Sequence, residues 1–494
     1  MKATFLGIDI GTQSSKGAVV DIDGNVVAQA SISHKLESPK PGYFEQDADE
    51  VWWYDTVYLS KELLKQLDDK SISHSTLQGM CVSTTAPCVL PLDKQGRPLR
   101  KGIMYGIDTR ASKQIEQLEN KIGKENIFAM TAQHLSSQSC CPKVLWIKEN
   151  EKDVWSKTDK IVTSSGYIVY KLTDRMCTDT YNAIGYVPLF NIREKRWDNK
   201  WEKEVFSLEL LPEILWTTEI VGTVTKQASL ESGLPLNLPV LTGTADAAAE
   251  AMSCGISSIG DMMMMYGSSN FFIMLTSALR PVEQFWASNW FEKGSTVLTG
   301  GMATVGSLFT WLNDTFPNRS FKEWENLAAT SNLGANGVTI LPYFAGERTP
   351  IFDSNAKGLF FGMQLTTTAG DIYQALQEAV GFGIKHNLDT LAQAGEKAER
   401  IVSIGGVTNS AMTMQIITDI INCPQQIPSQ SLGACYGDAF LAAYGTNSID
   451  SLKEIQRWVK IEKEYLPNQR HVAIYQEHYE KFRALYEATK HLMP

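Results

Sequence analysis

The chain has 494 residues, of which 43% are hydrophobic and 20% charged, and its formal net charge is −10. These values are typical of a globular protein with a large core, and the acidic balance argues against a nucleic-acid partner, which would favour a basic face. The eight cysteines include no CxxC pair that would indicate a zinc or redox site, and several lie in apolar stretches, as buried free thiols do, so we expect a cytoplasmic protein. No uncharged apolar run reaches the ~18 residues of a membrane helix, so we expect no membrane partner.

The first predicted elements are two strands joined by a tight turn. Residues 3–10 and 16–21 have strand-like composition, and a third strand at 25–30 follows the turn at Asp23–Gly24. The stretch that spans the turn between the first two strands reads GIDIGTQSSKG, from residue 7 to residue 17.

The turn in this stretch has the residue types of an anion site. Gly11 allows a sharp fold, so backbone amides can converge on a phosphate. The neighbouring hydroxyls belong to Thr12, Ser14 and Ser15. Asp9 would hold a magnesium ion or its water shell, and Lys16 would add a positive charge. Neither GxxxxGK[ST] nor GxGxxG is present, so an ordinary hairpin with a polar turn is the alternative interpretation.

Strand-like and helix-like segments alternate along the rest of the chain, which indicates an α/β fold. The further predicted strands are 78–84, 160–164, 239–244, 262–267, 271–275, 295–300 and 400–406. The predicted helices are 47–67, 109–122, 198–207, 245–253, 322–331, 371–393 and 471–491.

The pattern of the first hairpin recurs in the second half of the chain. Residues 262–275, MMMMYGSSNFFIML, again read as a strand, a small hydroxyl-rich turn and a strand. Two such units could hold opposite ends of one polyphosphate. We therefore predict two domains, 1–242 and 243–494, that face each other across a nucleotide.

A third glycine-rich turn follows the predicted strand at 400–406. Gly405 and Gly406 would let the backbone approach a flat ligand, and Asn409 could bond a base or ribose. The alternative is a plain strand-to-helix turn in which Asn409 caps the helix.

Taken in order, these motifs resemble the FGGY family of carbohydrate kinases, within the actin-like ATPase superfamily. The resemblance runs from about residue 5 to residue 445. It includes GIDIGTQSSK, GYFEQDADEVWW, LPLDKQGRPLRKGIMYGIDTR, KLTDRMCTDTYNAIGYVPLFNIREKRWD, GTADAAAEAMSCG, YGSSN, LPYFAGERTPIFD, GLFFGMQ and SIGGVTNS. The family implies two actin-like (ribonuclease H-like) domains facing each other across an ATP/sugar cleft, with a nucleotide-binding second domain that ends in helices.

The resemblance also implies roles for individual residues. Asp9 would organise magnesium, and Asp246 would be the general base. The ATP-binding residues would be Thr12, Gln13, Ser14, Ser15, Lys16, Gly267, Ser268, Gly306, Gly405, Gly406 and Asn409.

Asp246 also has a case independent of the family. It follows the predicted strand PVLTGT and begins a helix of small residues. A carboxylate in the first turn of a helix is favoured by the helix dipole, so we expect Asp246 to be ionised and able to accept a proton. A helix-terminal acid without catalytic function is the alternative.

The acceptor is predicted less directly. The resemblance implies that a pair of side chains just after the predicted strand at 78–84 contacts the acceptor, which makes Thr85 and Ala86 candidate sugar contacts. Glycerol kinases carry an arginine and a glutamate there, and xylulose kinases a methionine and a histidine, so the resemblance makes glycerol an unfavoured acceptor. Asp108 is a candidate for hydrogen bonding to sugar hydroxyls, or a cap of the helix at 109–122. We expect a keto-sugar or polyol acceptor, with D-xylulose first because the motif spacing is most similar to that branch of the family.

Other functions are left open by the sequence. The acceptor could be gluconate, another ketose or a signalling polyol, and an actin-like ATPase without a sugar substrate would use a similar nucleotide cleft. A homodimer is compatible with the sequence, which does not specify the oligomeric state.

Overall fold

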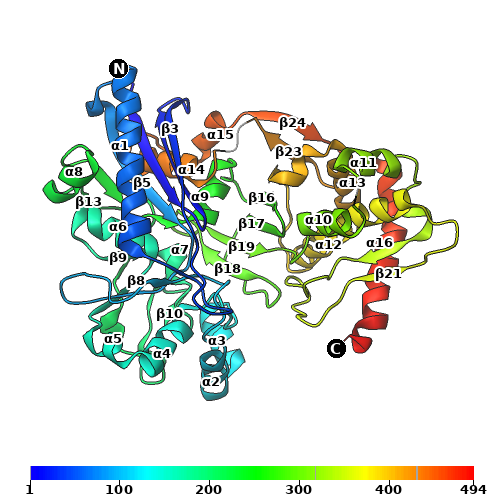
Figure 1. Cartoon of the computed structure of the whole chain (residues 1–494), viewed down its shortest axis with the longest axis horizontal. Helices are drawn as coiled ribbons and strands as arrows, with labels where there is room; N and C mark the ends of the chain where they lie inside the picture. The colour runs from blue at the N-terminus through cyan, green and yellow to red at the C-terminus, as the bar shows by residue number, and fades with distance from the viewer. Residues whose placement is uncertain (1, 318, 430–431, 494) are drawn as a thin grey trace.

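The computed structural model describes residues 2–317, 319–429 and 432–493 and contains two seven-stranded sheets, seen on the left and in the centre of Figure 1. The first sheet has the order β13–β14–β5–β1–β2–β3, with β15 added beside β5. Its strands are β1 (Thr4–Ile10), β2 (Ser14–Asp21), β3 (Val26–Ser33), β5 (Leu77–Thr84), β13 (Ile220–Thr223), β14 (Pro239–Leu241) and β15 (Thr244–Ala245).

The second sheet has the order β18–β19–β17–β16–β22–β23–β24. Its strands are β16 (Asp261–Tyr266), β17 (Asn270–Thr276), β18 (Trp286–Asn289), β19 (Thr296–Gly300), β22 (Arg400–Ile404), β23 (Gln425–Pro428) and β24 (Ile461–Tyr465). The central strands of both sheets are almost continuously apolar, as expected for strands covered on both faces.

The two sheets repeat one topology. In the first, β1 forms an antiparallel hairpin with β2 and runs parallel to β5. In the second, β16 forms an antiparallel hairpin with β17 and runs parallel to β22. The predicted α/β class and the repeated strand–turn–strand unit are confirmed.

Sixteen α-helices are present among the described residues. They are α1 (Tyr54–Asp69), α2 (Ser112–Ile122), α3 (Lys124–Thr131), α4 (Cys140–Asn150), α5 (Lys152–Lys157), α6 (Ser164–Thr173), α7 (Thr180–Ala183), α8 (Lys226–Ser232), α9 (Asp246–Ser253), α10 (Gly306–Thr315), α11 (Phe321–Ala328), α12 (Ala369–Gln393), α13 (Ala411–Ile421), α14 (Ala434–Gly445), α15 (Ile455–Trp458) and α16 (Gln469–Thr489). None of the helices in the described ranges is both long enough and apolar enough to cross a membrane.

The predicted helix at 198–207 is wrong. The segment forms a short 3₁₀ turn at Asn199–Trp201, and a second 3₁₀ turn begins after Ser207. The side chains of Asp198 and Ser207 each accept a hydrogen bond from the backbone two residues later, which favours separate turns over one helix.

Five two-stranded sheets are also present among the described residues, four in the first half of the chain and one in the second. They are β4 (Glu45–Gln46) with β7 (Gly102–Ile103), β6 (Leu90–Leu92) with β8 (Lys160–Val162), β9 (Cys177–Asp179) with β12 (Glu213–Leu215), β10 (Phe190–Asn191) with β11 (Arg196–Trp197), and β20 (Thr339–Leu341) with β21 (Leu359–Phe361).

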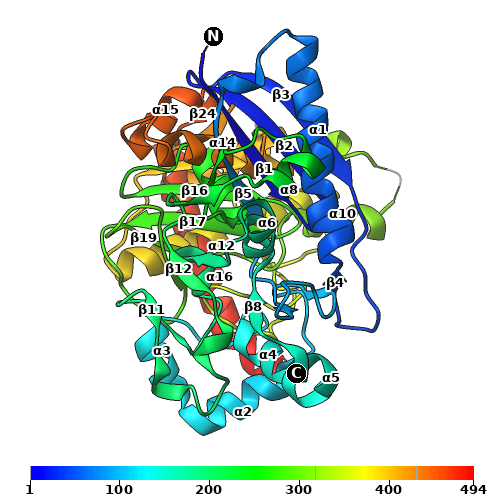
Figure 2. The same ribbon diagram turned by 90° about the vertical axis from the view of Figure 1, so that its left-hand side faces the viewer.

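Helices α9 and α14 lie between the two sheets (Figure 1), and Figure 2 shows the molecule from the side of the first sheet. Their apolar side chains share one buried cluster with residues of both sheets, including Phe5 of β1 and Met263 of β16. Helix α14 comes late in the chain but packs against the first sheet, so the polypeptide links the two sheets more than once. The predicted division at residue 242 stays a prediction: β15, just after it, pairs with β5 of the first sheet.

Candidate active site

The first hairpin places Asp9 and Lys16 directly opposite each other on β1 and β2. The turn between them is closed by the Gly11 N–H, which donates to the Ser14 carbonyl over 3.1 Å. The Lys16 and Gln13 side chains are exposed. The hairpin therefore presents a carboxylate, a cation and small polar groups at one end of the sheet.

Ser15 lies apart from this group. Adjacent strand residues point to opposite faces, and Ser15 is fully buried on the face away from Lys16. Its hydroxyl donates to Asp55 of α1 over 2.6 Å. This placement commits the hydroxyl to the core, so we leave Ser15 out of the site.

Three neighbouring strands bring Asp9, Thr85 and Asp246 to the same edge of the sheet. Strand β5 lies between β1 and β15 and runs parallel to both. Asp9 is one residue before the end of β1, Thr85 follows β5, and Asp246 follows β15. The carboxyl ends of parallel strands are where α/β proteins bind ligands.

A small hydroxyl network lies at this edge. The Thr12 hydroxyl is 3.3 Å from the Thr85 hydroxyl and 3.2 Å from the Tyr105 hydroxyl. Thr12 thus links the first hairpin with the segment around Thr85 and half-buried Ala86. Sequence reasoning missed Tyr105, although it belongs to the same YGIDTR segment as Asp108.

Asp108 is held in an ion pair. It is fully buried and accepts hydrogen bonds from the Arg110 guanidinium, at 2.7 to 3.0 Å, and from the Phe44 N–H at 2.7 Å. Helix α2 begins later, at Ser112, so Asp108 does not cap it. The carboxylate is committed to Arg110 and Phe44, and we remove Asp108 from the candidate sugar contacts.

Asp246 occupies the first turn of α9. Its Oδ1 accepts a hydrogen bond from the Ala247 N–H over 2.7 Å. Removal from water raises the pKa of Asp246 to about 7, and the negative charge of Glu250 one turn later acts in the same direction. The expectation that the helix dipole keeps Asp246 ionised must therefore be corrected: desolvation outweighs it, and the group titrates near neutral pH.

The surroundings of Asp9 are rich in negative charge. Burial raises the pKa of Asp9 well above its ordinary value, and repulsion from Asp246, Asp438 and Glu250 adds to this effect, while Lys16 opposes it. Such a cluster favours a cation, because a positive charge relieves the repulsion.

The donor set fits magnesium delivered with a nucleotide. Within the described ranges, no three or more His, Cys, Asp or Glu side chains are arranged to hold a metal ion by themselves. Magnesium needs no such cage, because it commonly binds through one or two carboxylates, phosphate oxygens and water. Asp9 can supply the carboxylate.

The second hairpin is joined to the beginning of α10. The Gly267 carbonyl accepts from the Gly306 N–H at 2.9 Å, and the Ser268 carbonyl accepts from the Val305 N–H at 2.8 Å. An added Cβ at Gly306 would lie 2.6 Å from the Gly267 oxygen, so this close approach requires glycine. The Ser268 side chain is left exposed.

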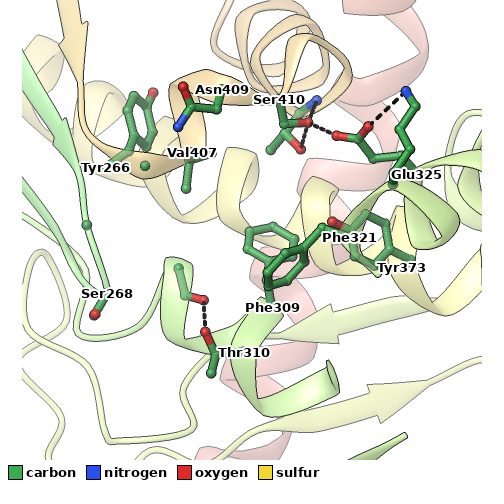
Figure 3. Close-up of a pocket in the computed structure, with 15 residues that line it drawn as sticks. Tyr266, Ser268, Phe309, Thr310, Phe321, Glu325, Tyr373, Val407, Asn409 and Ser410 are labelled. Atoms are coloured by element: carbon green, nitrogen blue, oxygen red, sulfur yellow. Dashed lines mark hydrogen bonds and ion pairs between the residues drawn. The ribbon is translucent and has the colours of Figure 1, made fainter. Parts of the chain in front are cut away.

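A cavity of about 530 Å³ extends from this junction (Figure 3). Its lining residues are Tyr266, Gly267, Ser268, Gly306, Phe309, Thr310, Phe321, Lys322, Glu325, Tyr373, Gly406, Val407, Asn409, Ser410 and Thr413. Figure 3 shows Ser268 on one side and Phe321 and Glu325 on the other. A cavity with small residues at the Ser268 side and the rings of Phe321 and Tyr373 at the other side suits a nucleotide.

The cavity brings together the predicted glycine-rich turns of the second half. Gly405 itself does not line it, but its positive φ of 99° makes the turn that presents Gly406 and Asn409. Asn409 does not cap α13, because Ser410 does so by accepting from the Thr413 N–H. The aromatic residues Phe309, Phe321 and Tyr373 were not predicted, since aromatic residues on helices are usually core residues.

Comparison with known proteins gives matches along nearly the whole chain. The N-terminal domain model of the FGGY family of carbohydrate kinases matches residues 4–253, and the C-terminal domain model matches residues 262–446. A xylulose kinase from Staphylococcus epidermidis is 30% identical over 499 residues, covering 100% of this chain and 98% of the relative.

Solved structures give the same picture of the fold. Xylulose kinase from Rhodospirillum rubrum has a TM-score of 0.93 at 27% identity and covers 99% of both chains. Gluconate kinase from Lactobacillus acidophilus has a TM-score of 0.91 at 22% identity, covering 99% of this chain and 98% of that one. The prediction of an actin-like two-domain fold is confirmed.

Proposed function

The chain belongs to the FGGY family of carbohydrate kinases and is an ATP-dependent sugar kinase, and we propose that it transfers the γ-phosphate of ATP to D-xylulose, giving D-xylulose 5-phosphate. The observation that carries the proposal is the convergence of Asp9, Thr85 and Asp246 at the ends of β1, β5 and β15. A phosphate site, an acceptor site and a base belong side by side in such an enzyme.

The nucleotide would occupy the cavity of the second half. The base would lie toward Phe321 and Tyr373, and the phosphates toward Ser268 and Gly306. Gly406 and Asn409 would line the path between them, with Gly267 and Gly405 shaping the two turns. This orientation of the nucleotide is supported by the aromatic rings, which suit a purine, and by the small residues, which suit close contact with phosphate.

The terminal phosphate would meet the first hairpin. There Thr12, Gln13 and Ser14 would donate hydrogen bonds, and Lys16 would offset negative charge. Asp9 would hold magnesium, which when bound neutralises charge on the phosphates.

Asp246 would accept the proton of the attacking sugar hydroxyl. Phosphoryl transfer depends mainly on positioning and charge neutralisation, and general-base help typically adds ~10²–10⁴-fold in rate. A pKa of about 7 suits this role, because the group then exists as both acid and base near neutral pH.

The sugar would contact the hydroxyl network around Thr85. Thr12, Thr85 and Tyr105 offer uncharged donors and acceptors, and half-buried Ala86 leaves space beside them. Uncharged polar groups suit a ketose better than an acceptor that carries a carboxylate.

The proposal also includes the division of the chain into two domains, 1–242 and 243–494, and a cytoplasmic location.

An acceptor panel in a coupled assay for ADP tests the proposal. We expect D-xylulose to give the highest kcat/KM, D-gluconate a lower value and glycerol the lowest. Glycerol should be poor because it leaves part of the hydroxyl network unpaired, and each buried unpaired group costs ~1–3 kcal/mol. If gluconate or glycerol outperforms every ketose, the proposed acceptor is wrong.

A further inference from the structure

Helix α14 carries a buried carboxyl group that the roles above do not use. The Asp438 side chain is fully buried. Its Oδ2 accepts a hydrogen bond from the Ser83 hydroxyl over 2.6 Å. Its Oδ1 has no hydrogen-bond partner in the described part of the chain. Burying a carboxyl group with an unpaired oxygen costs free energy, which calls for a functional reason.

Two glycines bring α14 close to the site. An added Cβ at Gly7 of β1 would lie 1.9 Å from the Cys435 carbonyl oxygen and 2.9 Å from Cβ of Asp438. An added Cβ at Gly437 would lie 1.9 Å from the Ala249 carbonyl oxygen of α9. Helix α14 therefore packs directly on the strand that carries Asp9 and on the helix that begins with Asp246. The close packing places Asp438 directly against β1.

Ser83 connects Asp438 with Asp9. It lies on β5 beside Asp9 in the parallel ladder. Its Oγ is 2.6 Å from Asp438 Oδ2 and 3.4 Å from Asp9 Oδ1. A hydroxyl has one proton and can donate it to only one of these carboxyl groups.

The protonation of Asp438 decides the direction of this chain of hydrogen bonds. Burial raises the pKa of Asp438 well above its ordinary value, although the hydrogen bond from Ser83 favours the charged form; the negative charge of Asp246 acts in the same direction as burial. A charged Asp438 accepts from Ser83, as in the structure. An Asp438 that has taken up a proton can instead donate to Ser83, and Ser83 can then turn its own proton toward Asp9. Asp9 gains a hydrogen bond that fixes one of its oxygens.

We propose that Asp438 is a positioning residue for phosphoryl transfer, which holds the Ser83 hydroxyl and through it orients the Asp9 carboxylate. The proposal rests on the function proposed above for Asp9. Asp438 contacts neither nucleotide nor sugar in this scheme.

The test compares Asp438→Asn with Asp438→Ala. The asparagine amide keeps the shape and a hydrogen bond to Ser83, so Asp438→Asn should retain most of the wild-type kcat. Asp438→Ala should lower kcat by roughly 10–100-fold, the usual effect of losing a group that orients a ligating residue, with the KM for sugar nearly unchanged.

A second arm does not depend on turnover. Calorimetry of ADP binding with and without magnesium should show that magnesium strengthens binding in the wild type and in Asp438→Asn, but much less in Asp438→Ala. Ser83→Ala should give the same losses, and the double variant Ser83→Ala/Asp438→Ala should be no worse than either single variant.

Phe440→Leu is the matched control for damage to α14. Phe440 lies in the buried cluster between the sheets and has no polar group to join the proposed chain of hydrogen bonds, so this variant should lose thermal stability but keep its kcat. If Asp438→Ala does not fold, Ser83→Ala is measured in its place.

Either of two results overturns the inference. One is an Asp438→Ala variant with the wild-type kcat and magnesium dependence of ADP binding. The other is an Asp438→Asn variant whose kcat is as low as that of Asp438→Ala. If the wild-type protein phosphorylates no sugar, the proposed function is wrong. The role of Asp438 is then tested by the calorimetry of magnesium-dependent ADP binding alone.

Discussion

Asp246 is subject to two opposing influences at the residue scale. The Ala247 N–H stabilises its charged form, while desolvation and Glu250 destabilise it. The net effect raises its pKa to about 7, so the carboxyl group can take up a proton near neutral pH. A group at the end of a strand in this state is suited to proton transfer.

Replacing Asp246 with alanine distinguishes a base from a structural acid. We expect Asp246→Ala to lose sugar phosphorylation and keep ATP binding, with sugar binding weakened by about 1 kcal/mol for one lost hydrogen bond. A helix-terminal acid without catalytic function would instead cost ~0.5–2 kcal/mol of unfolding free energy and leave kcat unchanged. Turnover, calorimetric ATP affinity and melting temperature on one preparation separate the two; normal turnover in the folded variant would rule out the base.

The pH dependence follows from the same group. A general base must lose its proton before it can act, so kcat/KM for sugar should rise as pH increases through about 7 and level off above it. Glu250→Gln removes a charge that raises the pKa of Asp246, so the midpoint should move to lower pH. A profile that falls with pH in this range, or a midpoint that Glu250→Gln leaves in place, would contradict the assignment.

At the element scale, the sequence predicts hairpins better than it predicts helices. The hairpins of β1–β2 and β16–β17 follow from short apolar runs separated by small polar turns. Helix α14 was missed because ACYGDAFLAAYG is apolar or small on every side, and a helix buried all round has no amphipathic period. Asp438 was missed with it.

Contacts that depend on long-range packing could not be read from the sequence. Asp108 looked free for a sugar, and only the fold brings the Phe44 N–H to it. Ser15 has the same residue type as Ser14, but the pleat turns it toward Asp55. Tyr105 reaches Thr12 across 93 positions of sequence, a proximity that no local pattern predicts.

The turn after β22 gives a prediction with its control next to it. Gly405 has φ of 99°, and an added Cβ would lie 2.5 Å from the Tyr266 carbonyl oxygen, whereas a Cβ at Gly406 meets nothing within 4 Å. Gly405→Ala should therefore lower the free energy of unfolding by about 1–3 kcal/mol. Gly406→Ala should leave stability nearly unchanged but weaken ADP binding, because the methyl group enters the cavity.

Urea unfolding and ADP calorimetry on both variants check this prediction. Equal stability of the two variants would show that the strain at Gly405 is misjudged. Unchanged ADP affinity in Gly406→Ala would argue against a nucleotide in the cavity.

At the scale of the whole molecule, the two sheets carry different parts of the candidate active site. The first carries the base and the hydroxyl network, and the second carries the cavity. Water competes with the sugar for the phosphate, so a kinase of this design should close on the sugar before transfer. Helices α9 and α14 lie between the sheets, where such a movement would have to be accommodated.

The central claim is that phosphate passes from ATP to a sugar hydroxyl, and quantitative ³¹P NMR of the reaction tests it most directly. With ATP, magnesium and D-xylulose, we predict one sugar phosphate formed for each ADP, and almost no inorganic phosphate when sugar is left out. ADP and inorganic phosphate released at the same rate with and without D-xylulose, and no sugar phosphate from any ketose, would contradict the account and indicate an ATPase.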